Sequence, residues 1–145
     1  MSTRHLVDPE LLPLLDLFGT IDLTALPLAE TRALSAGRFA MLGEPELAPE
    51  VKIAPGPDGP VEVYWYDPAP GTAGRAALLH VHGGGMVLGS ARDMRHGPAQ
   101  MAAALGIPVA SVEYRLAPEC PFPGPQEDCL AALSWLAAKI GRAHV

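Results

Sequence analysis

The residues best suited to chemistry are three consecutive glycines behind a histidine, His82-Gly83-Gly84-Gly85. Adjacent glycines cost backbone entropy, so folded chains keep them where a Cβ would be in the way. The apolar run at residues 76–81 has the length of a fully buried strand. Open α/β sheets place ligand chemistry at the carboxyl ends of such strands. The amides of Gly84 and Gly85 can therefore approach a small anionic atom, as an oxyanion hole for acyl transfer requires.

Two other chemistries, metal binding and phosphate binding, use similar residues. His80 and His82 point to one face of the strand because side chains alternate along it, and His96 follows in the next segment. No carboxylate or further ligand stands at a recognisable metal spacing, so we expect no metal. The Lys-Ser/Thr of a phosphate-binding loop and the second half of a G-x-G-x-x-G pattern are missing. We therefore expect no phosphate cradle.

A second motif, Val-Glu-Tyr-Arg-Leu-Ala-Pro-Glu, occupies residues 112–119. Phe122-Pro123, Asp128 and Trp135 follow it. With the glycine loop, and in this order and spacing, these residues make the chain resemble the hormone-sensitive-lipase-like branch of the α/β-hydrolase fold, over residues 51–138. The resemblance implies a mixed, mostly parallel sheet with flanking helices, of which this chain holds the N-terminal part.

The resemblance also implies roles for the glycine loop in the hydrolysis of carboxylic esters. Gly84 and Gly85 would supply two oxyanion donors, and a third would come from the residue after the nucleophilic serine. His82 and Gly83 would support the loop, and His82 would not be the catalytic base. The substrate would be a small-molecule ester with a short or medium acyl chain, and no cofactor is implied.

One part of the family pattern, the G-x-S-x-G elbow that carries the nucleophile, is missing. The serines at positions 2, 35, 90, 111 and 134 all have a different context. We therefore expect the nucleophile, the acid and the base to be absent from the chain, and the chain to be inactive as it stands. The alternative is a truncated, non-catalytic α/β module that binds a ligand or a partner.

The composition limits which classes of partner and which cellular location we expect for this chain. The net charge of −6 gives no basic footprint, so we expect no nucleic acid partner. No apolar run approaches the length of a membrane span, and no secretory signal opens the chain. Cys120 and Cys129 do not make a disulfide framework and lack the cationic neighbours of a reactive thiol. We expect a cytoplasmic protein with two inert cysteines.

The chain divides into three segments. Residues 1–50 predict helices, with Asp8 as a possible N-cap before Pro9 and a second helix at 28–41. The sequence alone leaves open a cap or a helical arm that only packs, and the resemblance implies the cap. The resemblance also implies that residues 51–139 form a partial α/β-hydrolase core. Its expected elements are strands at 51–53, 61–66, 76–81 and 107–112, a loop and helix within 92–105 ended by Gly106, and a helix at 126–138. Residues 140–145 read like a translated sequencing adapter, so we expect a non-native tail.

Three further expectations concern packing. Arg115 and Glu119 could form a structural ion pair, and Asp128 is expected to be a solvated or capping acid. In the resembled fold, the strand at 76–81 pairs with the nucleophile strand. In this chain it would become an unpaired apolar edge, which is an aggregation hazard. We therefore expect the fragment to be poorly soluble or only partly folded.

Overall fold

A computed structural model of the 145-residue chain describes residues 3–18, 25–71 and 74–140. The chain forms two compact units, Met1–Ala33 and Leu34–Val145, and the boundary falls inside helix α2 (Leu28–Ala40). Each unit is described by itself. The residues that we expected to form a tail, apart from Ile140, lie outside the described part.

The N-terminal unit is helical, as its sequence predicts. The 3-10 turns η1 (Arg4–Leu6) and η2 (Pro9–Leu11) precede helix α1 (Leu12–Phe18). The side chain of Asp8 accepts a hydrogen bond of 2.9 Å from the amide of Glu10, and proline occupies the first position of η2. This confirms the predicted N-cap, although the first turn is 3-10 and not α. The second predicted helix, at 28–41, is α2 and ends one residue earlier.

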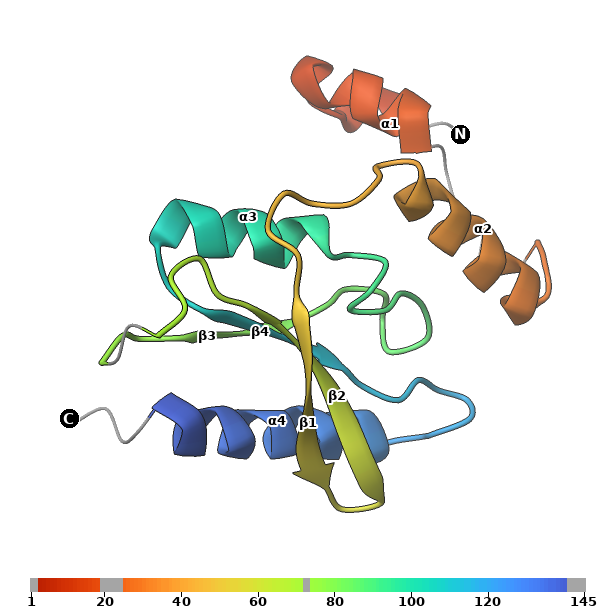
Figure 1. The fold of residues 1–145 in the computed structure, drawn as a ribbon. Helices are drawn as coiled ribbons and strands as arrows, with labels where there is room; N and C mark the ends of the chain where they lie inside the picture. The colour runs from red at the N-terminus through yellow and green to blue at the C-terminus, as the bar shows by residue number, and fades with distance from the viewer. Residues whose placement is uncertain (1–2, 19–24, 72–73, 141–145) are drawn as a thin grey trace. The chain divides into compact units, whose positions relative to one another are not determined.

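The second unit is built on a four-stranded sheet with the order β1-β2-β4-β3 (Figure 1). Strands β1 (Glu50–Gly56) and β2 (Gly59–Tyr66) form the expected antiparallel hairpin, and both are longer than predicted. Strand β4 (Val109–Glu113) runs antiparallel to β2 and parallel to β3 (Leu78–Val81). The parallel pair brings the carboxyl ends of β3 and β4 to the same end of the sheet. The glycine motif follows β3 directly, and the second motif begins in the last two residues of β4.

Helices cover both faces of this sheet (Figure 1). Helix α4 (Gly124–Ile140) closes the larger cluster, whose buried members are Ala54, Val61, Val63, Ala110, Val112, Tyr114, Ala132 and Leu136. Helix α3 (His96–Leu105) covers the opposite face through a smaller cluster of Tyr66, Ala99, Ala102 and Val109. Full burial of each valine contributes about 1.5–3 kcal/mol. The α/β class expected from the sequence is therefore confirmed.

The boundaries of α3 and α4 have local causes. Gly106 ends α3 in the left-handed conformation, with φ at 67°, and its amide bonds the carbonyl of Ala102 at 2.9 Å. This is the predicted glycine cap. Helix α4 begins at Gly124, two residues before the predicted start. It places Trp135 edge-on to Trp65, with ring centroids 6.1 Å apart and planes at 86°.

The strand before the glycine loop differs from its prediction. We expected a fully buried strand at 76–81, but β3 covers only Leu78–Val81 and its residues are half-buried or exposed. The reason is its position at the edge of the described sheet, where only β4 pairs with it. Val81 is 43% exposed there. None of the helices in the described residues is both long enough and apolar enough to span a membrane.

We predict that Val81→Lys reduces self-association of the 145-residue chain, because a charge on an edge strand blocks further strand pairing. Sedimentation or light scattering at equal concentration measures the effect. Val51→Lys is the matched control, since Val51 is similarly exposed (49%) on the opposite edge strand, which already carries Lys52 and Pro55. Equal self-association of the wild-type and Val81→Lys chains would contradict the prediction.

Candidate active site

The loop after β3 turns back on itself at Gly84. The amides of Val87 and Leu88 both donate to the carbonyl of Gly84, at 3.1 and 3.0 Å. A Cβ on Gly84 would lie 1.9 Å from the carbonyl oxygen of Leu88, and φ is +128°. Gly85 has φ of +62°, and Met86 continues the left-handed path at +65°. Gly84 is therefore required both by its backbone conformation and by lack of space.

The amides of Gly84 and Gly85 are the groups that could do chemistry. Within residues 3–18, 25–71 and 74–140, neither amide donates a hydrogen bond to another group. The place where a Cβ on Gly85 would stand is open, because no atom beyond Gly85 and its chain neighbours lies within 4 Å of it. Two amides of this kind at the end of a β-strand can bind one oxygen atom that carries negative charge.

The second motif holds the glycine loop in place. The hydroxyl of Tyr114 donates a hydrogen bond of 2.7 Å to the carbonyl of His82, and this bond is buried. The amide of Ala117 donates to the carbonyl of Met86 at 2.8 Å. The rings of His82 and Tyr114 stack, with centroids 4.1 Å apart and planes 10° apart. The two predicted motifs are therefore one packed structure.

The histidine of the motif, His82, is buried. Its Nδ1 lies 2.9 Å from the carbonyl oxygen of Gly83, which requires Nδ1 to donate the proton. Its Nε2 is buried, with no partner among the described residues. Burial lowers the pKa of His82, and the Gly83 carbonyl opposes this only in part. One ring nitrogen of His82 is hydrogen-bonded and the other is buried. The ring is therefore suited to supporting the loop, which is the role that the resemblance implies.

Glu113 holds the turn that follows the glycine loop, and sequence reasoning missed it. Its Oε2 accepts hydrogen bonds from the amides of Ala91 and Arg92, at 2.9 and 3.4 Å. Burial raises the pKa of this carboxyl group, although the two amides oppose the shift. A glutamate at the last position of a buried strand was the available signal, because such a side chain needs a partner when it is buried.

Asp128 is not the solvated or capping acid that we expected. It is only 2% exposed and accepts three hydrogen bonds from Arg115, from the amide at 3.0 Å, from Nε at 2.8 Å and from Nη2 at 2.9 Å. A buried carboxylate needs such a partner. Arg115 also pairs with Asp58 at 3.0 Å, and both carboxylates raise its pKa. The expected pairing with Glu119 stays a prediction.

Comparison with known proteins adds to this geometry. A sequence model described as the alpha/beta hydrolase fold matches residues 78–145. The carboxylesterase NlhH of Mycobacterium tuberculosis is 38% identical over 148 aligned residues, which cover 93% of this chain and 44% of the relative. Mouse hormone-sensitive lipase is 41% identical over 61 residues, 42% of this chain and 8% of the lipase. A structure titled bacterial heroin esterase superposes with a TM-score of 0.83 at 35% identity, covering 94% of this chain and 44% of that chain.

The chain belongs to the hormone-sensitive-lipase-like esterases of the α/β-hydrolase fold. The resemblance stated from the sequence and the expected fold class, a partial α/β-hydrolase fold, are both confirmed. The chain spans about half the length of the carboxylesterase and of the solved esterase that it matches.

One serine of this chain, Ser111, contacts a histidine, and sequence reasoning also missed this pair. His80 Nδ1 lies 2.9 Å from Ser111 Oγ, because the parallel register of β3 and β4 pairs these two residues. Ser111 is fully buried, so its hydroxyl is closed to a substrate. Burial, and then the neighbouring His82, lower the pKa of His80. We interpret the pair as part of the core.

The remaining candidate nucleophiles and metal ligands lie in surroundings that do not favour those roles. Ser90 accepts a hydrogen bond from the amide of Asp93 at 2.9 Å, and Ser134 is exposed on α4. Burial raises the pKa of the Cys129 thiol, which keeps it protonated and unreactive. Among the described residues, no group of three histidine, cysteine or acidic side chains could hold a metal ion.

We predict that Gly84→Ala destabilises the chain by about 2 kcal/mol or more, because the new Cβ meets backbone and the φ angle is strained. Gly83→Ala is the control, since open space surrounds that position. Its effect should stay below about 1 kcal/mol. Urea unfolding followed by circular dichroism measures both. Equal destabilisation by the two substitutions would contradict the geometry of the loop.

We predict that the free energy of unfolding falls as the pH drops from about 7.5 to 5.5. The pKa values of His80 and His82 are lowered in the folded chain, so below the ordinary value of 6.5 the unfolded chain binds more protons. Glu113, with a raised pKa, acts in the opposite direction. His82→Phe keeps a ring beside Tyr114 but cannot titrate, so its stability should depend less steeply on pH. Identical pH dependence in both proteins would contradict this assignment.

Proposed function

We propose that this chain supplies the oxyanion loop of a serine carboxylesterase. The observation that carries the proposal is the pair of glycine amides, at Gly84 and Gly85, that donate to no group among the described residues and lie just after β3. The membership of the family supports it, because relatives over the same residues are named as carboxylesterases.

In this proposal the two amides act on the carbonyl oxygen of the ester. As a serine attacks the carbonyl carbon, negative charge grows on that oxygen, and fixed amide donors stabilise it. Loss of one such donor costs about 10²–10³ in rate, or roughly 3–4 kcal/mol. A third donor would come from the residue after the serine. The reaction proceeds through an acyl-enzyme and uses neither a metal nor an organic cofactor.

The supporting roles go to residues around the two donors. His82 stacks on Tyr114 and bonds the Gly83 carbonyl, so it fixes the loop and is not the base. The nucleophile, the acid and the base are provided outside the residues of this chain. Esters with short or medium acyl chains are the proposed substrates, residues 1–50 are proposed as the cap segment, and a cytoplasmic location is proposed for the enzyme.

The test is a fusion of residues 1–140 to the remaining part of the bacterial heroin esterase, assayed with p-nitrophenyl acetate and butyrate. We expect ester hydrolysis by the fusion and about 10²–10³ lower kcat in its Gly84→Ala variant. Gly97→Ala is the control, because open space surrounds that position on α3. The 145-residue chain alone should give no hydrolysis that a serine-directed reagent abolishes.

Two outcomes count against the proposal. One is a fusion that folds, as judged by circular dichroism and melting, but hydrolyses no faster than its Gly84→Ala variant. That result would favour the non-catalytic binding module. The other is a burst of product from the 145-residue chain alone that a serine-directed reagent abolishes, which would place a nucleophile within these residues.

A further inference from the structure

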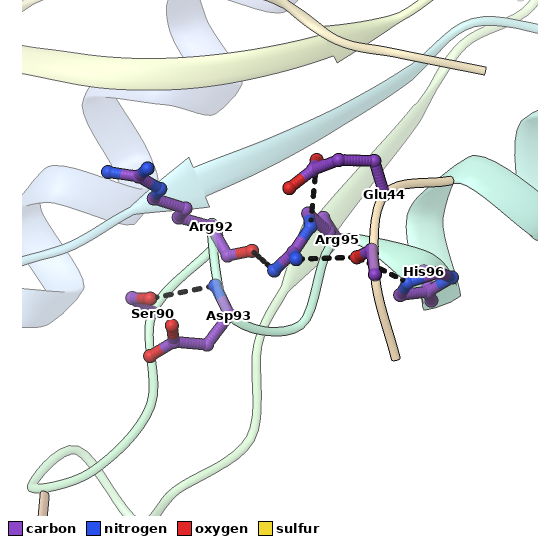
Figure 2. Close-up of polar contacts among 7 residues, drawn as sticks. Glu44, Ser90, Arg92, Asp93, Arg95 and His96 are labelled. Carbon is purple, nitrogen blue, oxygen red and sulfur yellow. Dashed lines mark hydrogen bonds and ion pairs between the residues drawn. The ribbon is translucent and has the colours of Figure 1, made fainter. Parts of the chain in front are cut away.

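One arginine at the start of α3, Arg95, binds three groups, two of which lie more than 50 positions earlier in the sequence (Figure 2). Arg95 Nη2 donates to the carbonyl of Gly43 at 2.5 Å, and Nε pairs with the Glu44 carboxylate at 3.1 Å. Nη1 donates to the carbonyl of Arg92 at 3.0 Å. The side chain of Arg95 is only 11% exposed. A planar guanidinium suits this arrangement because its donors point in several fixed directions.

The next residue holds the same carbonyl. His96 Nε2 lies 3.1 Å from the carbonyl oxygen of Gly43, so this nitrogen donates (Figure 2). Gly43 has φ of +73° and lies just after α2. Its amide donates a hydrogen bond of 3.2 Å to the carbonyl of Ala40, the last residue of that helix. Two neighbouring side chains, Arg95 and His96, therefore hold the carbonyl of Gly43, three residues after the end of α2.

The linker between α2 and β1, residues 41–49, also contacts the core through an apolar side chain. Leu47 packs against the cluster under α3. The linker and α3 together line an open pocket of about 470 Å³, whose walls include Glu44, Pro45, Leu47, His96 and Ala99. The polar contacts of Gly43 and Glu44 and the apolar contact of Leu47 therefore hold this part of the linker beside α3.

The third contact of Arg95 reaches the turn behind the glycine loop. The carbonyl of Arg92 accepts from the guanidinium, while its amide and that of Ala91 donate to Glu113 on β4. The amide of Asp93 is bound by Ser90 Oγ in the same turn (Figure 2). One side chain therefore links the linker to the turn that β4 fixes.

We propose that Arg95 is a positioning residue for the linker: it latches residues 41–49 to the turn behind the glycine loop. It thereby sets where the chain preceding β1 joins the α/β core. The inference goes beyond the proposed esterase function and stands on these contacts alone, so its test needs no catalysis.

Cleavage of the linker by a Glu-specific protease tests the latch in the 145-residue chain at low micromolar concentration. The reporter is the Glu46–Leu47 bond, since proline protects the bond after Glu44. Arg95→Gln should speed this cleavage about tenfold, because proteolysis follows the population of the open linker and charge-assisted hydrogen bonds are lost. Mass spectrometry of the fragments 1–46 and 47–145 gives the rate.

Three variants separate the latch from a general effect of charge. Arg92→Gln removes the same charge from an exposed side chain and keeps the backbone carbonyl, so its rate should match the wild type. Arg95→Lys keeps the charge but loses the planar set of donors of the guanidinium. Its cleavage rate should fall between those of the wild type and Arg95→Gln. Glu44→Gln should change the rate less than twofold, since the side chain of Glu44 is 80% exposed and such pairs contribute little.

Cleavage at Glu62–Val63, inside β2, measures global unfolding in the same digest. A selective rise at Glu46–Leu47 with partial rescue by lysine supports the latch. Equal rates in Arg95→Gln and Arg92→Gln would overturn it. So would an equal rise at both bonds, because Arg95 would then stabilise the whole core and not the linker.

Discussion

The buried hydrogen bond between the Tyr114 hydroxyl and the His82 carbonyl is the interaction on which the candidate site depends. Gly84 and Gly85 follow left-handed backbone paths that no regular element stabilises. Their shape persists because Tyr114 stacks on His82 and Ala117 binds the carbonyl of Met86. Without those contacts three glycines would sample many conformations, and the loop would not keep one shape.

The sheet order explains how these contacts arise. Strands β3 and β4 are parallel neighbours, so the segments after them leave the sheet side by side. The second motif then continues into α4 through the Arg115–Asp128 pair, which fixes the path between strand and helix. The glycine loop, the second motif and the start of α4 are therefore held by a single set of contacts that reaches into the larger cluster.

Local signals were readable in the sequence, and contacts between distant segments were not. Asp8 and Gly106 act within one turn of their own helices, so residue type alone predicted them. The need for glycine at 84 was also predictable, although the atom that excludes a Cβ was not. Asp128 was misjudged because its burial depends on Arg115, thirteen positions away. Arg95 was not singled out, since its partners lie at Gly43 and Glu44.

The packing of α4 has a consequence for how the chain folds while it is being synthesised. The last described helix packs against β1, the first strand of the sheet, so the larger cluster combines both ends of this unit. A ribosome must release nearly all of α4 before that cluster can close, and such non-local closure is slow. Trp65 and Trp135 are the only tryptophans of the chain, and they meet at this contact. Their fluorescence therefore reports when the larger cluster between α4 and the sheet has formed.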